Sequence, residues 1–362
     1  MMPRPRLSWC SALLVVGVVA AACGSGNERA ASGPPSTTIG TSASMAEVEV
    51  DVDLGSQLGL DEGEAAPEQL SGPRVVDTPL GAFEVPADPQ RIVVTELNLV
   101  LPTLLDLGID VYGIWDASAT ATPARTLVSQ DEWDALAIVG SGIDPNVERL
   151  AAAKPDLVIH TPLTDKDVDL ISPFSAIVPI EFTLSWKDDV RIVADAVDQV
   201  DEMETLLADY EYRAAELAAR IDASFGDPSV AVLRVRPDSI RVHTNLHFSG
   251  ELLTDMGLRV PADYEYELAD SRRDAKLLVR LSPEQVGLLA AADYIFVMPL
   301  GSLLQTQDEV EDALEELQNG GLWRALPAVQ EGRVTVVGPH WFSGSLRAAE
   351  LALQDVESFM FG

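Results

Sequence analysis

Cysteine and basic side chains are scarce in this chain of 362 residues. It has two cysteines, Cys10 and Cys23, and its 24 Lys and Arg face 58 Asp and Glu, for a formal net charge of −34. Nucleic acid binding needs clustered basic residues, so this charge disfavours a nucleic acid partner. We interpret the acidity as a solvated surface, with a preference for cationic or neutral ligands as the alternative.

The apolar run near the N-terminus, residues 13–20, is too short to span a bilayer. It follows Arg4 and Arg6, and two alanines stand between it and Cys23, which is the order of a secretory signal. The cleavage site resembles a bacterial lipobox. We therefore expect residues 1–22 to be removed and a lipid on Cys23 to hold the protein on the extracytoplasmic face of the cell membrane. An ordinary secretory signal is the alternative.

Loss of Cys10 with the signal would leave a mature chain with no disulfide, no cysteine metal site and no catalytic thiol. An exported fold of this kind must be stabilised by its hydrophobic core. The length and the 47% hydrophobic composition are sufficient for that and suggest two domains. Residues 23–72 are instead rich in small and acidic residues and have no helical or strand period, so we predict a disordered tether.

Short apolar strands alternate with helical patterns in residues 73–184, which predicts parallel βαβ units and an N-terminal α/β lobe. One helix is expected to open at Asp144, as the N-cap, with Pro145 in its first turn. The expected strands are residues 91–94, 111–114, 137–140, 156–160 and 177–182, with a further helix at residues 99–107.

Residues 185–225 contain no Pro or Gly and carry apolar residues at helical spacing, so we interpret them as a connecting helix with room for a kink or for two helices. Residues 226–362 repeat the α/β pattern as a C-terminal lobe. Its expected strands are residues 230–235, 240–243, 294–298 and 333–337, and its expected helices are residues 250–256, 282–289, 308–317 and 345–361. The predicted fold class is therefore α/β, with two lobes joined by a long helix.

Three blocks of the sequence resemble the siderophore-type substrate-binding proteins of ABC transporters. They are residues 91–114, with Arg91-Ile-Val-Val and a Leu-Asp-Leu-Gly motif; residues 139–159, with Lys154-Pro-Asp-Leu; and residues 322–337, with Leu322-Trp-Arg-Ala-Leu-Pro. The resemblance implies a class III periplasmic-binding-protein fold, with two Rossmann-like lobes, central parallel sheets and a ligand cleft between them. It also implies capture of a ferric siderophore, vitamin B12 or haem, delivery to a membrane permease with its ATPase, and no catalysis.

Ligands lie beyond the carboxyl ends of the strands in open parallel sheets. His160, His243 and His340 end or follow expected strands, and His247 lies four residues beyond His243. A histidine there can donate to the oxygens of a chelate or carry a positive charge at mildly acidic pH. A loop histidine with local hydrogen bonds is the alternative for each.

Arg234 and Arg236 stand at the end of one expected strand and share a face by alternation. We expect them to bind carboxylate or hydroxamate oxygens, with a surface salt bridge as the alternative for each. Arg241 lies in the next strand and is expected to point away. Trp115 and Trp341 follow expected strands and are candidates for the apolar wall of the cleft, or else for packing.

The family resemblance implies docking to the permease through one surface carboxylate on each lobe. Glu251 matches the position in the second lobe, with a helix-start role as the alternative. The first-lobe helix has Val100 and Pro102 where a glutamate is often found, and Glu96 is a possible substitute. This difference leaves docking at two points open.

Other classes of function fit the sequence less well. No nucleophile elbow, phosphate loop, zinc-protease motif or paired-cysteine site is present, which disfavours an enzyme. A receptor for bare Zn²⁺ or Mn²⁺ would use the histidines, but they lack the spacing of a preformed site. A lipid-anchored sensor or scaffold is a third class. We predict a monomeric receptor without a cofactor that captures a ferric siderophore; the low count of basic residues slightly favours a hydroxamate, and cobalamin or haem stays open.

Overall fold

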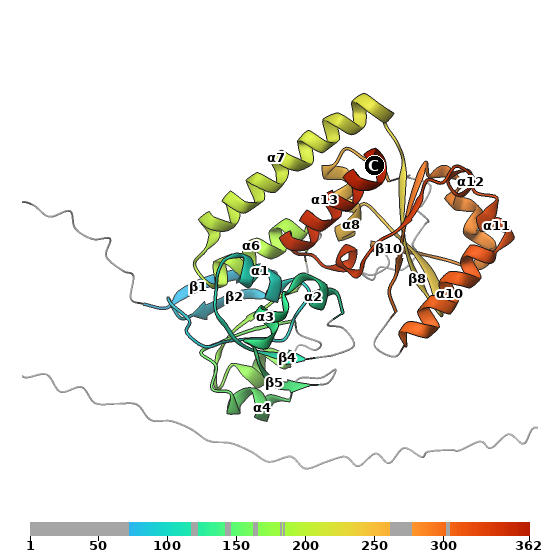
Figure 1. The fold of residues 1–362 in the computed structure, drawn as a ribbon. Helices are drawn as coiled ribbons and strands as arrows, with labels where there is room; N and C mark the ends of the chain where they lie inside the picture. Colours follow the sequence, from blue (N-terminus) through green and yellow to red (C-terminus); the bar gives the residue numbers. More distant parts are fainter. Residues whose placement is uncertain are drawn as a thin grey trace, which may run out of the picture. The chain divides into compact units, whose positions relative to one another are not determined.

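Two five-stranded sheets organise the part of the chain that the computed structural model describes (Figure 1). That part comprises residues 72–116, 122–141, 146–161, 166–181, 183, 185–260, 277–301 and 305–362. It belongs to one compact unit that spans Pro67–Gly362. The expected signal, Cys23 and almost all of the expected tether lie outside the described residues. No helix of the described residues is both long enough and apolar enough to cross a bilayer.

The first sheet is parallel throughout, with strand order β5-β4-β3-β6-β7. Its central strands are continuous apolar runs because both faces of the sheet are covered, as is usual for parallel sheets. The strands are β3 (Ile92–Val94), β4 (Val111–Asp116), β5 (Ala137–Ser141), β6 (Leu157–His160) and β7 (Ala176–Pro179). A hairpin that the sequence analysis missed, β1 (Arg74–Thr78) and β2 (Gly81–Val85), precedes them.

The helices of this lobe are short and alternate with its strands. They are α1 (Val100–Asp106), α2 (Thr122–Leu127), α3 (Gln130–Asp134), α4 (Val147–Ala152) and α5 (Asp167–Ile171). The expected N-cap of α4 was wrong: Asn146 caps it, because the Asn146 side chain accepts the amide hydrogen of Arg149 at 3.0 Å. Residues 142–145, with Asp144, lie outside the described ranges.

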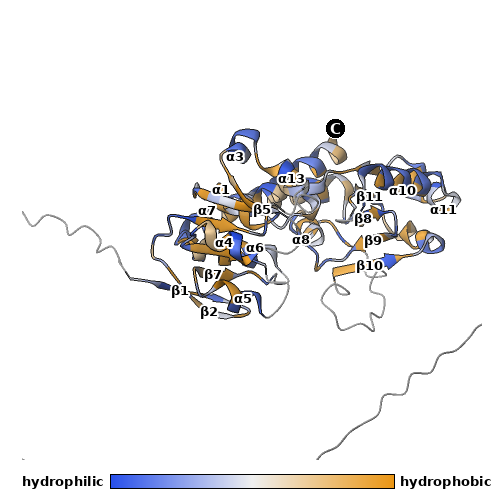
Figure 2. Cartoon of the chain, turned by 90° about the horizontal axis from the view of Figure 1, so that it is seen from below, coloured by the Kyte–Doolittle hydropathy of each residue, from blue (hydrophilic) through white to orange (hydrophobic). Residues whose placement is uncertain are grey.

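The second sheet is mixed, with order β10-β9-β8-β11-β12. Strands β8 (Val230–Arg236), β11 (Tyr294–Pro299) and β12 (Val334–Val336) are parallel, whereas β9 (Ser239–His243) and β10 (Leu278–Leu281) run antiparallel to their neighbours. The α/β class with parallel central strands is confirmed, but β9 has the opposite direction to the one assumed and β10 was not predicted. Hydrophobic residues gather on the strands of both sheets, while α3 and α10 (Gln307–Asn319) carry hydrophilic ones (Figure 2).

The remaining elements of the second lobe surround this sheet. They are α8 (Phe248–Asp255), the 3₁₀ helices η2 (Pro283–Ala291) and η3 (Pro339–Phe342), α11 (Gly321–Arg324), α12 (Pro327–Gln330) and α13 (Leu346–Phe361). A capping box of Ser282 and Gln285 begins the helix expected at residues 282–289, but this helix, η2, is 3₁₀ and not α.

The connecting segment is two helices, α6 (Trp186–Ala196) and α7 (Val200–Phe225). Between them Asp198 has a φ of 59°, a left-handed conformation that ends the first helix. The last helix, α13, runs beside α7 (Figure 1), and ion pairs of Arg213 with Glu350 and Arg220 with Glu357 join the two. One apolar core includes residues of both sheets and of α7 and α13, so the two lobes share a core.

Candidate ligand-binding site

Arg234, His243, His247 and Phe342 form one cluster in the second lobe. Arg234 and His243 come from β8 and β9, His247 precedes α8, and Phe342 ends η3. The ring centroids of His243 and His247 lie 3.8 Å apart, and that of Phe342 lies 5.6 Å from His247 and 6.3 Å from His243. The Arg234 guanidinium lies over the Phe342 ring at 4.2 Å, a cation–π contact. The structure therefore brings three of the eight predicted ligand residues together.

Both histidines of this cluster are held through Ser249. The Ser249 hydroxyl lies 2.7 Å from Nδ1 of His243 and 3.2 Å from Nδ1 of His247, and the Ser249 amide donates to Nδ1 of His247 at 3.3 Å. A ring nitrogen that accepts carries no proton, so the neutral His247 ring has its proton on Nε2. Nε2 of His243 is buried and has no hydrogen-bond partner among the described residues.

Burial makes these imidazoles neutral. Burial and the positive charge of Arg234 lower the pKa of His247 to about 3. Burial, His247 and the neighbouring arginines lower the pKa of His243 well below its usual value. The idea that these histidines carry a positive charge at mildly acidic pH was therefore wrong. They can serve as hydrogen-bond donors instead.

Arg234 supplies the positive charge of the cluster. Its side chain is largely buried, and it donates to the carbonyl oxygens of Leu300, at 2.8 Å, and Gly301. Burial, followed by the charges of Arg236 and Arg241, lowers the pKa of Arg234 to about 9, so the group is still charged at neutral pH. A buried cation among other cations is stabilised when an anion binds beside it.

His160 belongs to a separate cluster at the carboxyl end of β6. Its Nδ1 lies 2.7 Å from Oγ1 of Thr95, and its Nε2 lies 3.5 Å from the Asp167 carboxylate. Burial lowers the pKa of His160, and Asp167 offsets this only in part. Next to it, the buried Thr161 hydroxyl has no hydrogen-bond partner among the described residues. These polar groups end the first sheet where a ligand is expected.

The two lobes meet close to these clusters. The Ser343 hydroxyl, next to Phe342, donates to the carbonyl oxygen of Asn98 in the loop after β3. Arg347 at the start of α13 pairs with Asp106 of α1 and, at 2.9 Å, with Glu132 of α3. Contacts across the lobes therefore fix the position of η3, and with it Phe342.

The structure corrects the predictions for both tryptophans, because each is a core residue. Trp115 is 2% exposed and packs in the core of the first lobe, where a Cβ on Gly140 would lie 2.0 Å from its ring. Trp341 is fully buried and stacks on Phe296, with 4.7 Å between ring centroids. Neither indole can form an exposed wall of a cleft.

His340 also has a partner within the fold. Its Nε2 lies 2.8 Å from the Asp355 carboxylate, which accepts the indole hydrogen of Trp341 at the same distance. His340 is therefore part of the packing between η3 and α13.

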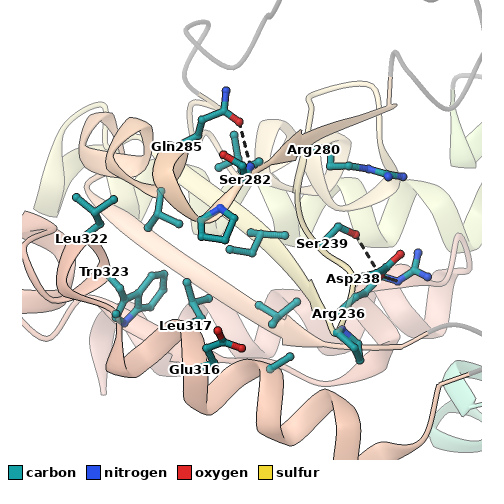
Figure 3. A pocket seen from close by; sticks show the side chains of 18 of the residues that line it. Arg236, Asp238, Ser239, Arg280, Ser282, Gln285, Glu316, Leu317, Leu322 and Trp323 are labelled. Atoms are coloured by element: carbon teal, nitrogen blue, oxygen red, sulfur yellow. Dashed lines mark hydrogen bonds and ion pairs between the residues drawn. The ribbon is translucent and has the colours of Figure 1, made fainter. Parts of the chain in front are cut away.

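Arg236 lies at the rim of a cavity of about 800 Å³ (Figure 3). Its guanidinium pairs with Asp238 at 3.2 Å and donates to Gln305 at 3.3 Å. Leu317 and Trp323 form an apolar side of the cavity. None of the other predicted ligand residues lines this cavity, so it is distinct from the cluster around Arg234.

Glu251 and Glu96 both cap helices. The Glu251 carboxylate accepts from the Ser185 hydroxyl at 2.8 Å and from the Trp186 amide at 3.1 Å, and so caps α6. Glu96 accepts from three amides at the start of α1. Glu251 lies in the first turn of α8, but its hydrogen bonds go to the start of α6 and not to its own helix, so the helix-start alternative did not anticipate these contacts. The role of Glu251 in docking stays a prediction.

Two residues of the site were missed by the sequence analysis. Phe342 was passed over in favour of its neighbour Trp341, and nothing in the pair Trp-Phe indicates which ring faces the core. Arg241 was expected to point away, yet it is directly opposite Arg234 on the same face of the sheet. Its alternation with His243 was a usable signal. Within the described ranges, no three His, Cys, Asp or Glu side chains gather closely enough to hold a metal ion.

Comparison with known proteins supports this architecture. The chain is 28% identical over 263 residues to the "Putative ABC transporter substrate-binding lipoprotein YhfQ" of Bacillus subtilis, covering 70% of this chain and 78% of that protein. It is 28% identical over 293 residues to the "Probable siderophore-binding lipoprotein YfiY" of the same organism, covering 79% and 87%. The crystal structure of Staphylococcus aureus SirA complexed with staphyloferrin B matches with a TM-score of 0.68 at 21% identity, covering 79% and 98%.

A family model described as "Periplasmic binding protein" matches residues 102–340, well over half of the chain. This match includes every strand of the first sheet except β3, all strands of the second sheet, and the connecting helices α6 and α7. The resemblance carried by the three sequence blocks is thus confirmed, and the chain belongs to the periplasmic binding protein family.

Proposed function

We propose that this protein is the substrate-binding component of an ABC importer that captures a ferric siderophore outside the cell and delivers it to a membrane permease. The observation that carries the proposal is the cluster around Arg234. A largely buried guanidinium that donates to two carbonyl oxygens lies over an aromatic ring beside two neutral histidines. Such a cluster offers positive charge, donors and an apolar surface to an oxygen-rich chelate.

The relatives support the same function. Two of them are named as substrate-binding or siderophore-binding lipoproteins, and the SirA structure holds staphyloferrin B. Binding is reversible and the ligand leaves unchanged, so no catalytic group is needed. The chelate is bound by contacts with the Phe342 ring and by hydrogen bonds from Arg234, His243 and His247.

We also propose that a lipid on Cys23 anchors the mature protein outside the cell membrane and that residues 24–72 give it reach. The lipoprotein names of two relatives and the small residues before Cys23 support this. Docking to the permease would use Glu251 from the second lobe. A modest closure of the lobes is expected on binding, because α6 and α7 connect them rigidly.

Titration of the mature chain, with Cys23 replaced by serine, tests the proposal through the fluorescence of its tryptophans. The panel holds ferric hydroxamates, ferric citrate, a ferric catecholate, cobalamin, haem and Zn²⁺. We expect saturable quenching by a ferric chelate. Arg234→Gln should weaken that chelate by about 1.5–3 kcal/mol, the value of a charged hydrogen bond, whereas Arg259→Gln, a matched change at an exposed site, should not. A response to Zn²⁺, cobalamin or haem alone would contradict the proposal.

A further inference from the structure

The loop that follows β3 connects the polar clusters of the two lobes. At its start, Oγ1 of Thr95 lies 2.7 Å from Nδ1 of His160, in the first-lobe cluster. Near its end, the carbonyl oxygen of Asn98 accepts a hydrogen bond from the Ser343 hydroxyl of the second lobe. Ser343 directly follows Phe342, whose ring lies in the second-lobe cluster. One short loop therefore contacts the first cluster itself and the residue next to the second.

The loop is fixed by its own hydrogen bonds. The Glu96 carboxylate accepts the amide hydrogen of Asn98 at 3.0 Å. It also accepts those of Leu99 and Val100, at 2.7 and 2.9 Å, and so ties the loop to the start of α1. The carbonyl group of Asn98 therefore has a defined position at which it meets Ser343.

The second lobe also packs closely against this loop. Ser343 is fully buried. A Cβ on the next residue, Gly344, would lie 3.2 Å from Cδ1 of Leu99 and 3.7 Å from Cβ of Trp186, the first residue of α6. A residue without a side chain permits this approach of the backbone. The contact thus combines a hydrogen bond with tight packing and leaves Ser343 little freedom to move.

The position of Ser343 determines where the Phe342 ring lies. The Ser343 amide donates to the carbonyl oxygen of His340 at 3.0 Å, so Ser343 and the turn of η3 that contains Phe342 form one unit. The Phe342 ring lies 4.2 Å from the Arg234 guanidinium and 5.6 Å from the His247 ring. A shift of Ser343 would change both distances.

We infer that Ser343 is a positioning residue for ligand binding: its hydrogen bond to Asn98 fixes the Phe342 ring relative to the first lobe before the ligand arrives. This inference rests on the proposed function and adds to it a residue that acts through its neighbour and not by touching the ligand. A site that is already ordered loses less conformational entropy on binding, so loss of the hydrogen bond should reduce affinity.

The test compares Ser343→Ala with Thr103→Val, both made in the mature chain. The Thr103 hydroxyl is equally buried and donates to the carbonyl oxygen of Leu99 at 2.6 Å, but this hydrogen bond lies within the first lobe. The probe is whichever of ferric citrate, a ferric tris-catecholate and a ferric trihydroxamate saturates the wild-type chain. We expect Ser343→Ala to weaken that chelate by about three- to tenfold, the value of a neutral hydrogen bond, and Thr103→Val by less than about twofold. Stopped-flow fluorescence should show the loss mainly as faster dissociation.

A double-mutant cycle tests whether Ser343 acts through Phe342. In the Phe342→Leu background, Ser343→Ala should change the affinity by less than about twofold, because the ring that it positions is gone. Gly344→Ala disturbs the same contact independently, by placing a methyl group against Leu99, and should also weaken the chelate. The urea midpoints of all variants show whether each one folds, and Gly344→Ala serves if Ser343→Ala does not.

Each result decides the matter. Unchanged affinity in Ser343→Ala, or an equal loss in Thr103→Val, would overturn the inference and leave the proposed function intact. Additive losses in the cycle would also overturn it, because Ser343 would then not act through Phe342. If none of the three chelates binds the wild-type chain, the proposed function fails, and the inference fails with it.

Discussion

Two adjacent aromatic residues, Trp341 and Phe342, should respond to substitution in opposite ways. Trp341 is fully buried, stacks on Phe296 and donates to Asp355 at 2.8 Å. In Trp341→Phe the hydrogen bond to a charged acceptor is lost, at a cost of about 1.5–3 kcal/mol. The smaller ring also leaves a gap that costs about 1 kcal/mol more. We expect the free energy of unfolding to fall by about 2.5–4 kcal/mol and the affinity for the chelate to stay within about twofold.

Phe342→Leu should do the reverse. The ring is half-buried, so a leucine of similar volume should reduce the stability by less than about 1.5 kcal/mol. The loss of the ring under the Arg234 guanidinium and beside His247 should weaken the chelate by about 0.5–2 kcal/mol, which is roughly two- to thirtyfold.

Urea unfolding and a chelate titration on both variants measure these effects side by side. The wild-type protein and Phe359→Leu, a half-buried ring in the core beside Phe296, serve as references. The reasoning would be refuted if Trp341→Phe kept its urea midpoint and lost the chelate. Trp341 would then line the ligand site, which is one of the two roles that the sequence analysis left open.

Three further predictions concern the pH dependence of stability, a helix cap and the contact between lobes. Between about pH 6.5 and 3, His247 binds a proton in the unfolded chain but stays neutral in the folded protein, so stability should fall as the pH falls through this window. His247→Asn, whose side-chain oxygen can replace Nδ1 as the cap of α8, should reduce the slope of the free energy of unfolding against pH by up to about 1.4 kcal/mol per unit. An unchanged slope would contradict this. Glu251→Gln should lower the free energy of unfolding, measured by urea titration, by about 1 kcal/mol and leave the affinity for the chelate unchanged. If this variant keeps its affinity but loses uptake in cells, Glu251 also takes part in docking. Arg347→Met should destabilise the fold by about 3–5 kcal/mol, because Asp106 is left buried without its partner. Glu132 is the more exposed of the two carboxylates that pair with Arg347, so Glu132→Gln should cost less. Equal losses in the two variants, measured by calorimetry, would refute the argument.

The order of elements could be predicted because alternation of apolar runs and helix caps is local. The helices and parallel strands that were predicted lie within a few residues of their expected places, but the short helices α2, α3, α5, α11 and α12 were not predicted. The direction of β9 was wrong, although Pro237-Asp238 between two strands is a hairpin signal. The assumption that β9 is parallel led us to expect His243 at the rim of the sheet and Arg241 pointing away from Arg234.

The site itself was predicted only in part, because it depends on tertiary contacts. Arg234, His243 and His247 were each proposed as ligand residues, and the fold brings the three together; that they bind a ligand stays a prediction. Nothing local distinguishes Trp115 from a ligand-facing ring; its burial follows from Gly140 on the neighbouring strand, which leaves room for the indole. The choice between Trp341 and Phe342 likewise depends on Asp355, a residue of the last helix.

Uptake of radioactive iron by cells tests the central claim most directly. A strain that lacks this protein would be supplied with iron-55 bound to the chelate that saturates the purified chain. Uptake should be lost, restored by the wild-type gene and reduced in proportion to affinity by Arg234→Gln, while Arg259→Gln should restore it fully. Unchanged uptake without the protein, or full rescue by a variant that no longer binds the chelate, would contradict capture and delivery of a ferric siderophore as its function.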